Sequence, residues 1–235
     1  MSEHIVKAFT EQLESLANSV AQMGGLAEAQ FANAIESIAK RDGKLAEAAI
    51  GSDERVDRIQ HTIEEHALKL LALRQPMAVD LRATLAAIKI ANELERIGDL
   101  GKNIGKRALV LNREPPIRLT QSLARMGRQA LAQLKMVLDA YSDRDAEAAR
   151  NVWKHDEEID ELYNSLFREL LTYMMEDPRT ITSCTHLLFM AKNIERAGDH
   201  VTNIAELVSF RTTGRGFDEV RPKGSASLYA AGNAS

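Results

Sequence analysis

The sequence is poor in the features that mark secreted, membrane-spanning and nucleic-acid-binding proteins. Cys184 is the only cysteine among 235 residues, which excludes a disulfide framework and a cysteine-based zinc site. No uncharged apolar run approaches the roughly 20 residues that span a bilayer. A net charge of -4 offers no basic surface for nucleic acid. Because Met1 to His4 lead into a charged amphipathic pattern, not an apolar signal, we expect a cytoplasmic protein that does not insert into the membrane.

The signatures of common enzyme classes are missing as well. The chain has no P-loop, no Rossmann glycine fingerprint and no Gly-x-Ser-x-Gly elbow. It also lacks the Glu-x-x-His motifs of a ferritin-like bundle with two metal ions. The sequence therefore predicts no catalytic residue and no organic cofactor.

Few residues interrupt helices, since the chain has five prolines and 13 glycines, and 45% hydrophobic against only 5% aromatic residues favours helices packed through aliphatic side chains. Apolar periodicity predicts helices over about 5–41, 44–50, 53–74, 76–111 and 119–141, and a last one from 178 to about 210. Ser52 is expected to cap the helix after it, Pro76 to open the next, and Asp177-Pro178 to open the last. The fold class predicted is all-α.

An internal repeat organises these helices. The segment Glu95-Arg96-Ile97-Gly98-Asp99 returns 100 residues later as Glu195-Arg196-Ala197-Gly198-Asp199, and at an offset of 103 Arg41-Asp42 matches Arg144-Asp145. Two similar halves follow from this repeat. We predict two tandem three-helix bundles, over 1–112 and 119–211, joined by a linker over 113–118 and followed by a flexible tail over 212–235.

Each half carries two acidic pairs spaced by one helical turn. They are Asp53 with Asp57, Glu95 with Asp99, Asp156 with Asp160, and Glu195 with Asp199. On a helical wheel the stripe with Glu95 points away from the apolar face, so the carboxylates are not a buried catalytic pair. Counting residues from the turn between antiparallel helices brings the two pairs of a half level, at about 1.5 Å per residue. A patch of four carboxylates is expected on each bundle.

Four like charges repel one another, and a hard or borderline cation would offset that repulsion. Carboxylates with an amide carbonyl suit Mg, Mn, Fe or Zn. We therefore regard all eight carboxylates as candidate metal ligands, with Asn103 and Asn203 as less certain ones. The competing interpretation is a solvated acidic surface that the repeat has merely copied. Arg96 and Arg196 could bind an anion there, but we favour pairing with neighbouring carboxylates.

These acidic motifs, the stretch from Gln75-Pro76 to Asp80-Leu81-Arg82 and the two-fold repeat together resemble the PhoU family over roughly residues 5 to 211. The resemblance implies two three-helix bundles and metal clusters held on the bundle surface by the four acidic pairs. It also implies a cytosolic regulator that acts through the ATPase subunit of a Pst-type phosphate transporter and the PhoR sensor kinase to repress the phosphate-starvation response. Lys192 stands where the first half has Asn92, which argues against equal occupancy of the two sites.

Three functions compete at this point. The leading hypothesis is a non-enzymatic regulatory adaptor that binds metal and forms a homodimer. A metal-dependent phosphatase or hydrolase is the first alternative, because metal-bound carboxylate sites can activate water, although an exposed patch lacks an enclosing pocket. A metal-free helical scaffold is the second.

Overall fold

The computed structural model describes residues 2–74 and 76–217, and all regular secondary structure in these two ranges is helical. The helices are α1 (Ser2–Ala39), α2 (Gly43–Gly51), α3 (Asp53–Arg74), α4 (Val79–Leu111), α5 (Thr120–Asp143), α6 (Ala146–Lys154), α7 (Glu157–Glu176), the 3-10 turn η1 (Pro178–Thr180) and α8 (Ile181–Thr213). The predicted all-α fold of two tandem three-helix bundles is confirmed. In each half a short helix, α2 or α6, precedes the second long helix.

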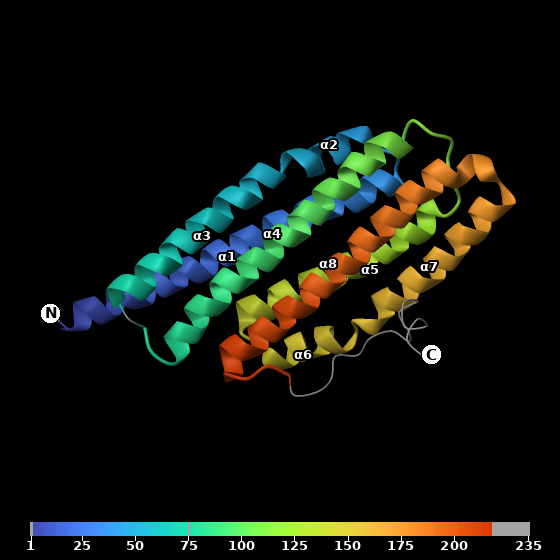
Figure 1. The fold of residues 1–235 in the computed structure, drawn as a ribbon. Coiled ribbons are helices and arrows are strands. Elements are labelled where there is room, and N and C mark those ends of the chain that lie inside the picture. The colour runs from blue at the N-terminus through green and yellow to red at the C-terminus, as the bar shows by residue number, and fades with distance from the viewer. Residues whose placement is uncertain (1, 75, 218–235) are drawn as a thin grey trace, which may run out of the picture.

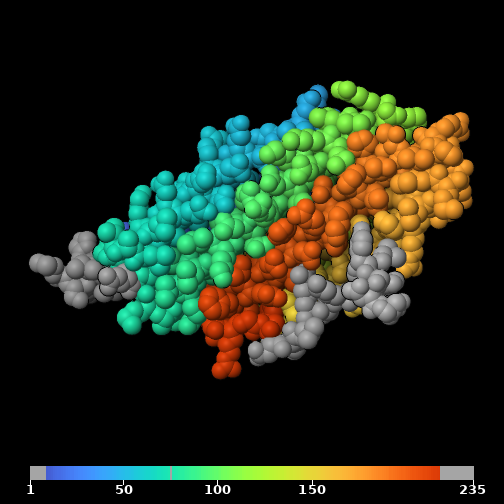
Figure 2. Space-filling view, in the orientation of Figure 1, coloured from blue at the N-terminus to red at the C-terminus, as the bar shows by residue number. Residues whose placement is uncertain are grey.

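The two halves pack along the whole length of their long helices. Figure 1 shows α4 and α8 side by side in the middle of the molecule, with α3 beside α4 and α7 beside α8, while α1 and α5 lie behind them. The four front helices form one broad face, which Figure 2 shows in teal, green, orange and gold. Buried side chains from both halves belong to a single hydrophobic core. The two bundles are therefore held together by their core.

The repeat extends to backbone conformation. Arg41 has φ +54° and Arg144 has φ +56°, a left-handed conformation that is uncommon for residues other than glycine. Each arginine is followed by an aspartate that caps the next short helix: Asp42 Oδ1 accepts from the amide of Lys44 at 2.8 Å, and Asp145 Oδ1 from that of Glu147 at 2.9 Å. The same local chemistry thus turns the chain in both halves.

The apolar face predicted for α4 is buried. Ile90, Leu94, Ile97 and Ile104 have no exposed surface. Opposite them, the amide of the buried Gln30 on α1 donates to the carbonyl oxygens of Ala49 at 3.0 Å and of Gly98 at 3.1 Å. This one side chain ties α1, α2 and α4 together.

Two predicted helix starts are wrong in detail. Ser52 has helical backbone angles and its hydroxyl donates to the carbonyl oxygen of Ala48 at 2.7 Å, so it ends α2 and does not cap α3. Pro76 lies before α4, which begins at Val79 because Ala78 has φ +48° and interrupts the helical path. At the corresponding place in the second half the prediction holds, since Asp177 caps the turn that Pro178 opens into α8.

The end of the chain differs slightly from the prediction. Residues 212 and 213, assigned to the tail, belong to α8, while 218–235 of that predicted tail lie outside the described residues. The domain boundaries stay a prediction. No helix in the described part of the chain combines the length and the apolar content that crossing a membrane requires.

Candidate functional site

The structure brings the four carboxylates of the first half together where α3 packs against α4. Asp53 and Asp57 lie in the first two turns of α3, and Glu95 and Asp99 lie in the middle of α4. Burial raises the pKa of Asp57, and the negative charges of Asp53 and Asp99 raise it further. Burial also raises the pKa of Glu95, with Asp99 as the next cause. The four groups are thus close enough to repel one another.

A lysine of the same half partly neutralises this first cluster, which we define as Asp53, Asp57, Glu95 and Asp99. The ammonium of Lys102 on α4 forms an ion pair with Asp53 across the helix interface. It also lies 3.5 Å from Asp99 Oδ1, one turn back on α4. The hydrogen bond to Asp53 raises the pKa of Lys102, so the charge is held firmly. Lys102 therefore bridges the two helices.

The second cluster, defined as Asp156, Asp160, Glu195 and Asp199, lies where α7 packs against α8. Burial raises the pKa of Glu195, and Asp199 and Asp160 raise it further, while Lys192 lowers it. Asp156 precedes α7, is 4% exposed and accepts a hydrogen bond of 2.7 Å from the hydroxyl of Thr202 on α8. Thr202 is the repeat counterpart of Lys102, so a neutral hydroxyl replaces the bridging ammonium.

The second cluster has a lysine too, but at another position. Lys192 Nζ lies 2.7 Å from Glu195 Oε2 within α8 and 5.3 Å from the centre of the Tyr163 ring. The counterparts of Lys192 and Tyr163 in the first half are Asn92 and Gln60, which hydrogen-bond each other at 2.8 Å. In each cluster a lysine ammonium thus pairs with one of the carboxylates, but the lysine stands at a different repeat position in each half.

The carboxylates of each cluster repel one another, and a hard cation would stabilise them. All eight predicted ligands are carboxylates, and the buried Glu195 Oε2 has the Lys192 ammonium 2.7 Å away. Hard oxygen donors of this kind suit Mg, Mn, Fe or Zn. As the side chains stand, no three acidic, histidine or cysteine residues in the described ranges converge tightly enough to hold one ion. Binding of a metal ion at either cluster would require its lysine to move away from the carboxylates.

The two asparagines named as less certain ligands lie differently. Asn203 donates its side-chain amide to Glu93 Oε2 on α4 at 3.0 Å, across the interface between the two halves, and Asn103 is exposed on α4. His200 Nδ1 meets the same Glu93 oxygen at 2.7 Å. Although burial favours the neutral form, these hydrogen bonds hold the pKa of Glu93 below its usual value. The amide nitrogen of Asn203 is therefore engaged between α4 and α8.

Sequence reasoning missed Glu93, because only the packing of α4 on α8 brings it to His200, 107 residues away. It also missed the role of Lys102, although the spacing of three residues from Asp99 was visible in the sequence. The expectation that Arg96 pairs with a neighbouring carboxylate is confirmed by its Nε, which lies 3.5 Å from Glu95 Oε2.

Comparison with known proteins gives a consistent result. The family model described as "PhoU domain" matches this chain twice, over residues 20–108 and 123–208. A protein of Caulobacter vibrioides named phosphate-specific transport system accessory protein PhoU homolog is 57% identical over 224 residues, which cover 95% of this chain and 97% of that protein. A protein of Rhizobium meliloti with the same name is 50% identical over 94% of this chain and 93% of its own length.

A solved structure resembles this chain in fold as well as in sequence. The crystal structure of PhoU from Pseudomonas aeruginosa superposes with a TM-score of 0.85 at 35% sequence identity. The match covers 88% of this chain and 99% of the other. Both halves thus have the architecture of that solved protein.

Proposed function

This chain belongs to the PhoU family, and we propose that it is a cytoplasmic regulator of phosphate uptake and of the phosphate-starvation response. It acts as an adaptor on the ATPase subunit of a phosphate ABC transporter and on a PhoR-type sensor kinase, and so represses the Pho regulon. The names of its relatives support this role, because they describe accessory proteins of a phosphate-specific transport system. The proposal makes the chain a non-enzymatic protein.

The metal part of the proposal rests on one observation, the recurrence in each half of four carboxylates where two helices pack, with a lysine paired to one of them. Four carboxylates repel one another, and each cluster lies between two helices of the outer face, where water and ions have access. A divalent or trivalent cation such as Fe, Zn, Mn or Mg would supply the missing positive charge. Its ligands would be Asp53, Asp57, Glu95 and Asp99 in one half and Asp156, Asp160, Glu195 and Asp199 in the other.

In protein without bound metal, the ion pairs of Lys102 would fix the positions of the helices at the first cluster. Lys102 holds Asp53 on α3 to Asp99 on α4, so it fixes the relative position of the two helices. If the carboxylates bound a cation, this bridge would be released and the ammonium would be free to move toward solvent. The interface between α3 and α4 would then depend on the ion. Partner binding at this face would respond to metal for that reason.

The test compares metal content and thermal stability in two double variants, each purified without chelator. Glu95→Ala with Asp99→Ala removes half of the first cluster, while Glu54→Ala with Glu65→Ala removes two exposed carboxylates of α3 outside it. We expect the first variant to lose the metal of one cluster and the second to keep it. At a hundredfold excess over the dissociation constant, the lost stabilisation is about 2.7 kcal/mol.

The same pair of variants tests the function. The first should fail to repress a phosphate-starvation reporter in cells, and the second should repress it normally. Wild-type metal content in the first variant would reduce the clusters to solvated surface. Loss of metal with unchanged repression would separate the metal from the regulatory role. Metal-dependent release of phosphate from esters by the wild type would favour an enzyme.

A further inference from the structure

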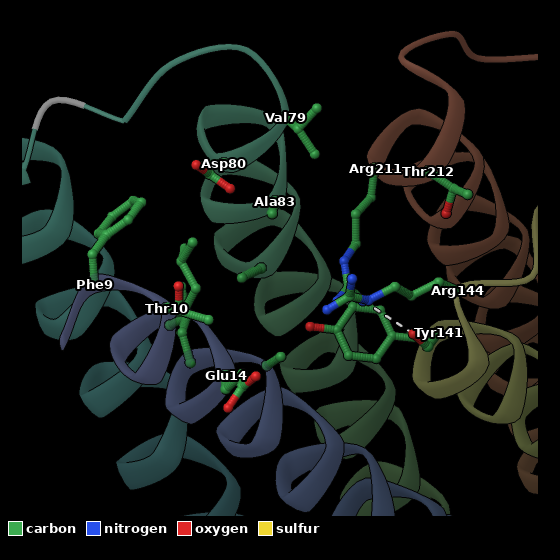
Figure 3. Close-up of a pocket in the computed structure, with 14 residues that line it drawn as sticks. Phe9, Thr10, Glu14, Val79, Asp80, Ala83, Tyr141, Arg144, Arg211 and Thr212 are labelled. Carbon is green, nitrogen blue, oxygen red and sulfur yellow. Dashed lines mark hydrogen bonds between the residues drawn. The ribbon is translucent and has the colours of Figure 1, made fainter. Parts of the chain in front are cut away.

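A cleft that sequence reasoning did not anticipate opens where the two halves meet. It has a volume of about 470 Å³ and lies between the N-terminal parts of α1 and α4 and the C-terminal ends of α5 and α8 (Figure 3). A second hollow of about 300 Å³ shares five of its lining residues, namely Glu14, Ala17, Tyr141, Arg144 and Arg211. The size is that of a cavity for a small organic molecule.

Two arginines form the polar wall of this cleft. Arg211 is only 9% exposed, and its Nη1 donates to the carbonyl oxygen of Tyr141 at 3.0 Å while its guanidinium stacks on the Tyr141 ring at 4.3 Å. Burial lowers the pKa of Arg211, and the charge of Arg144 lowers it too. Among the described residues, neither guanidinium forms an ion pair with a carboxylate. Two guanidinium groups thus line the same cavity.

The remaining wall is apolar with an acidic edge. Phe9, Leu13, Val79 and Ala83 are among the apolar residues that line the cleft. Glu14 and Asp80 line it as well, and Glu14 also lines the second hollow with Arg144 and Arg211, whose side chains meet at Tyr141 in Figure 3. A ligand would therefore meet positive charge at the two arginines, apolar contacts along the wall, and acceptor groups at Glu14 and Asp80.

The first half provides an internal comparison, because the repeat places an equivalent space there. Its lining includes Arg41, Leu111 and Leu187, the counterparts of Arg144, Arg211 and Ala87, but its volume is only about 10 Å³. The connection between α4 and α5 covers it, and Arg41 Nη2 donates to the carbonyl oxygen of Asn112 at 3.0 Å. In the first half, then, the arginine has backbone acceptors, while in the second the arginine faces an open cleft.

We propose that this cleft binds a small phosphate monoester, with Arg144 and Arg211 holding the phosphate and the apolar wall holding the organic part. A phosphate monoester is close to a dianion at neutral pH, which matches two guanidinium groups. The cleft is larger than phosphate alone requires, so it has room for the organic group of the ester beside the phosphate. Glu14 and Asp80 disfavour a second phosphate because they would repel it. A nucleoside monophosphate has the required shape and charge.

This inference does not depend on metal binding, and its test keeps the two apart. Binding of AMP, adenosine and inorganic phosphate to the full chain is measured by isothermal titration calorimetry. AMP should bind more tightly than inorganic phosphate, and adenosine should bind far more weakly than AMP. The variant Glu95→Ala with Asp99→Ala should bind AMP as the wild type does, since its substitutions lie outside the cleft.

Arg144→Gln is the decisive variant, because Arg144 is exposed and its loss leaves the core intact. It should weaken AMP binding about tenfold or more, as expected for loss of a charged hydrogen bond. Arg41→Gln is the matched control at the equivalent position and should bind AMP like the wild type. Arg211→Lys retains the charge but loses the planar guanidinium, and should also weaken AMP binding. The inference is overturned if AMP does not bind saturably, if adenosine binds as tightly as AMP, or if both glutamine variants behave alike.

Discussion

The close packing of α1 on α5 gives a sharp test of the fold at three glycines. Gly24 and Gly127 are repeat counterparts, and each faces the other half. A Cβ on Gly127 would lie 2.4 Å from Ile35 Cδ1 and 2.9 Å from both Cγ atoms of the same side chain. A Cβ on Gly24 would lie 2.5 Å from Leu138 Cδ2, the end of a flexible side chain. Next to it, Gly25 is exposed and has no atom within 4 Å of its Cβ position.

Alanine at these positions changes two opposing quantities. In a helix interior Gly→Ala gains about 1 kcal/mol from the more restricted unfolded chain. Overpacking of a core costs about 1 to 3 kcal/mol. Ile35 is fully buried and branched at Cβ, so it has little freedom to move aside. We expect Gly25→Ala to stabilise by up to about 1 kcal/mol, Gly24→Ala to be nearly neutral, and Gly127→Ala to destabilise by about 1 to 2 kcal/mol.

The measurement is thermal and urea unfolding of the three variants beside the wild type, with chelator present. For a chain of this size 1 kcal/mol corresponds to about 2 to 4 °C in melting temperature, so the two extreme variants should differ by several degrees. Gly25→Ala is the control for helix propensity alone. If Gly127→Ala raised stability as much as Gly25→Ala, α1 and α5 would not be as close as the structure places them.

Two further predictions concern Lys102 and Cys184. Lys102→Ala should lower the melting temperature of metal-free protein, because Asp53 loses its partner, and should increase the affinity of the first cluster for metal; an unchanged metal titration would show that the lysine does not compete. Burial raises the pKa of the Cys184 thiol, so the unfolded chain ionises first and stability should fall as the pH rises past the ordinary thiol pKa. Cys184→Ala should flatten this alkaline loss, and in the wild type the fully buried thiol should react with a thiol reagent only after unfolding; rapid labelling of folded protein at neutral pH would contradict its burial.

The parts of the fold that depend on local chemistry could be predicted from the sequence. Apolar periodicity gave the helices, and the repeated Arg-Asp dipeptides marked the turns before the short helices. The acidic pairs came level because residue counts along antiparallel helices fix their height. Ser52 and Pro76 were misassigned because serine and proline can each stand inside a helix end or just outside it. Which one is used depends on the path of the preceding helix.

Contacts between the halves could not be predicted in the same way. The repeat shows that the halves are similar, but it does not say which faces meet. Glu93 reaches His200 and Asn203 only because α4 packs against α8. The cleft with Arg144 and Arg211 likewise depends on how the two halves pack, whereas the connection between α4 and α5 lines its counterpart. Such features follow from the assembly of the two halves.

The different lysines make the two clusters unequal in a direction that the sequence left open. Lys192 argued from the sequence only against equal occupancy of the two sites, and Lys102 lies in the first cluster and bridges two helices there. Lys192 pairs with the largely buried Glu195 on its own helix, three residues away, so this pair does not bridge two helices as the Lys102 pair does. Withdrawing Lys102 leaves the largely buried Asp53 without its partner, whereas Asp156 keeps its hydrogen bond from Thr202 when Lys192 moves. A cation competing with these lysines should therefore fill the second cluster before the first.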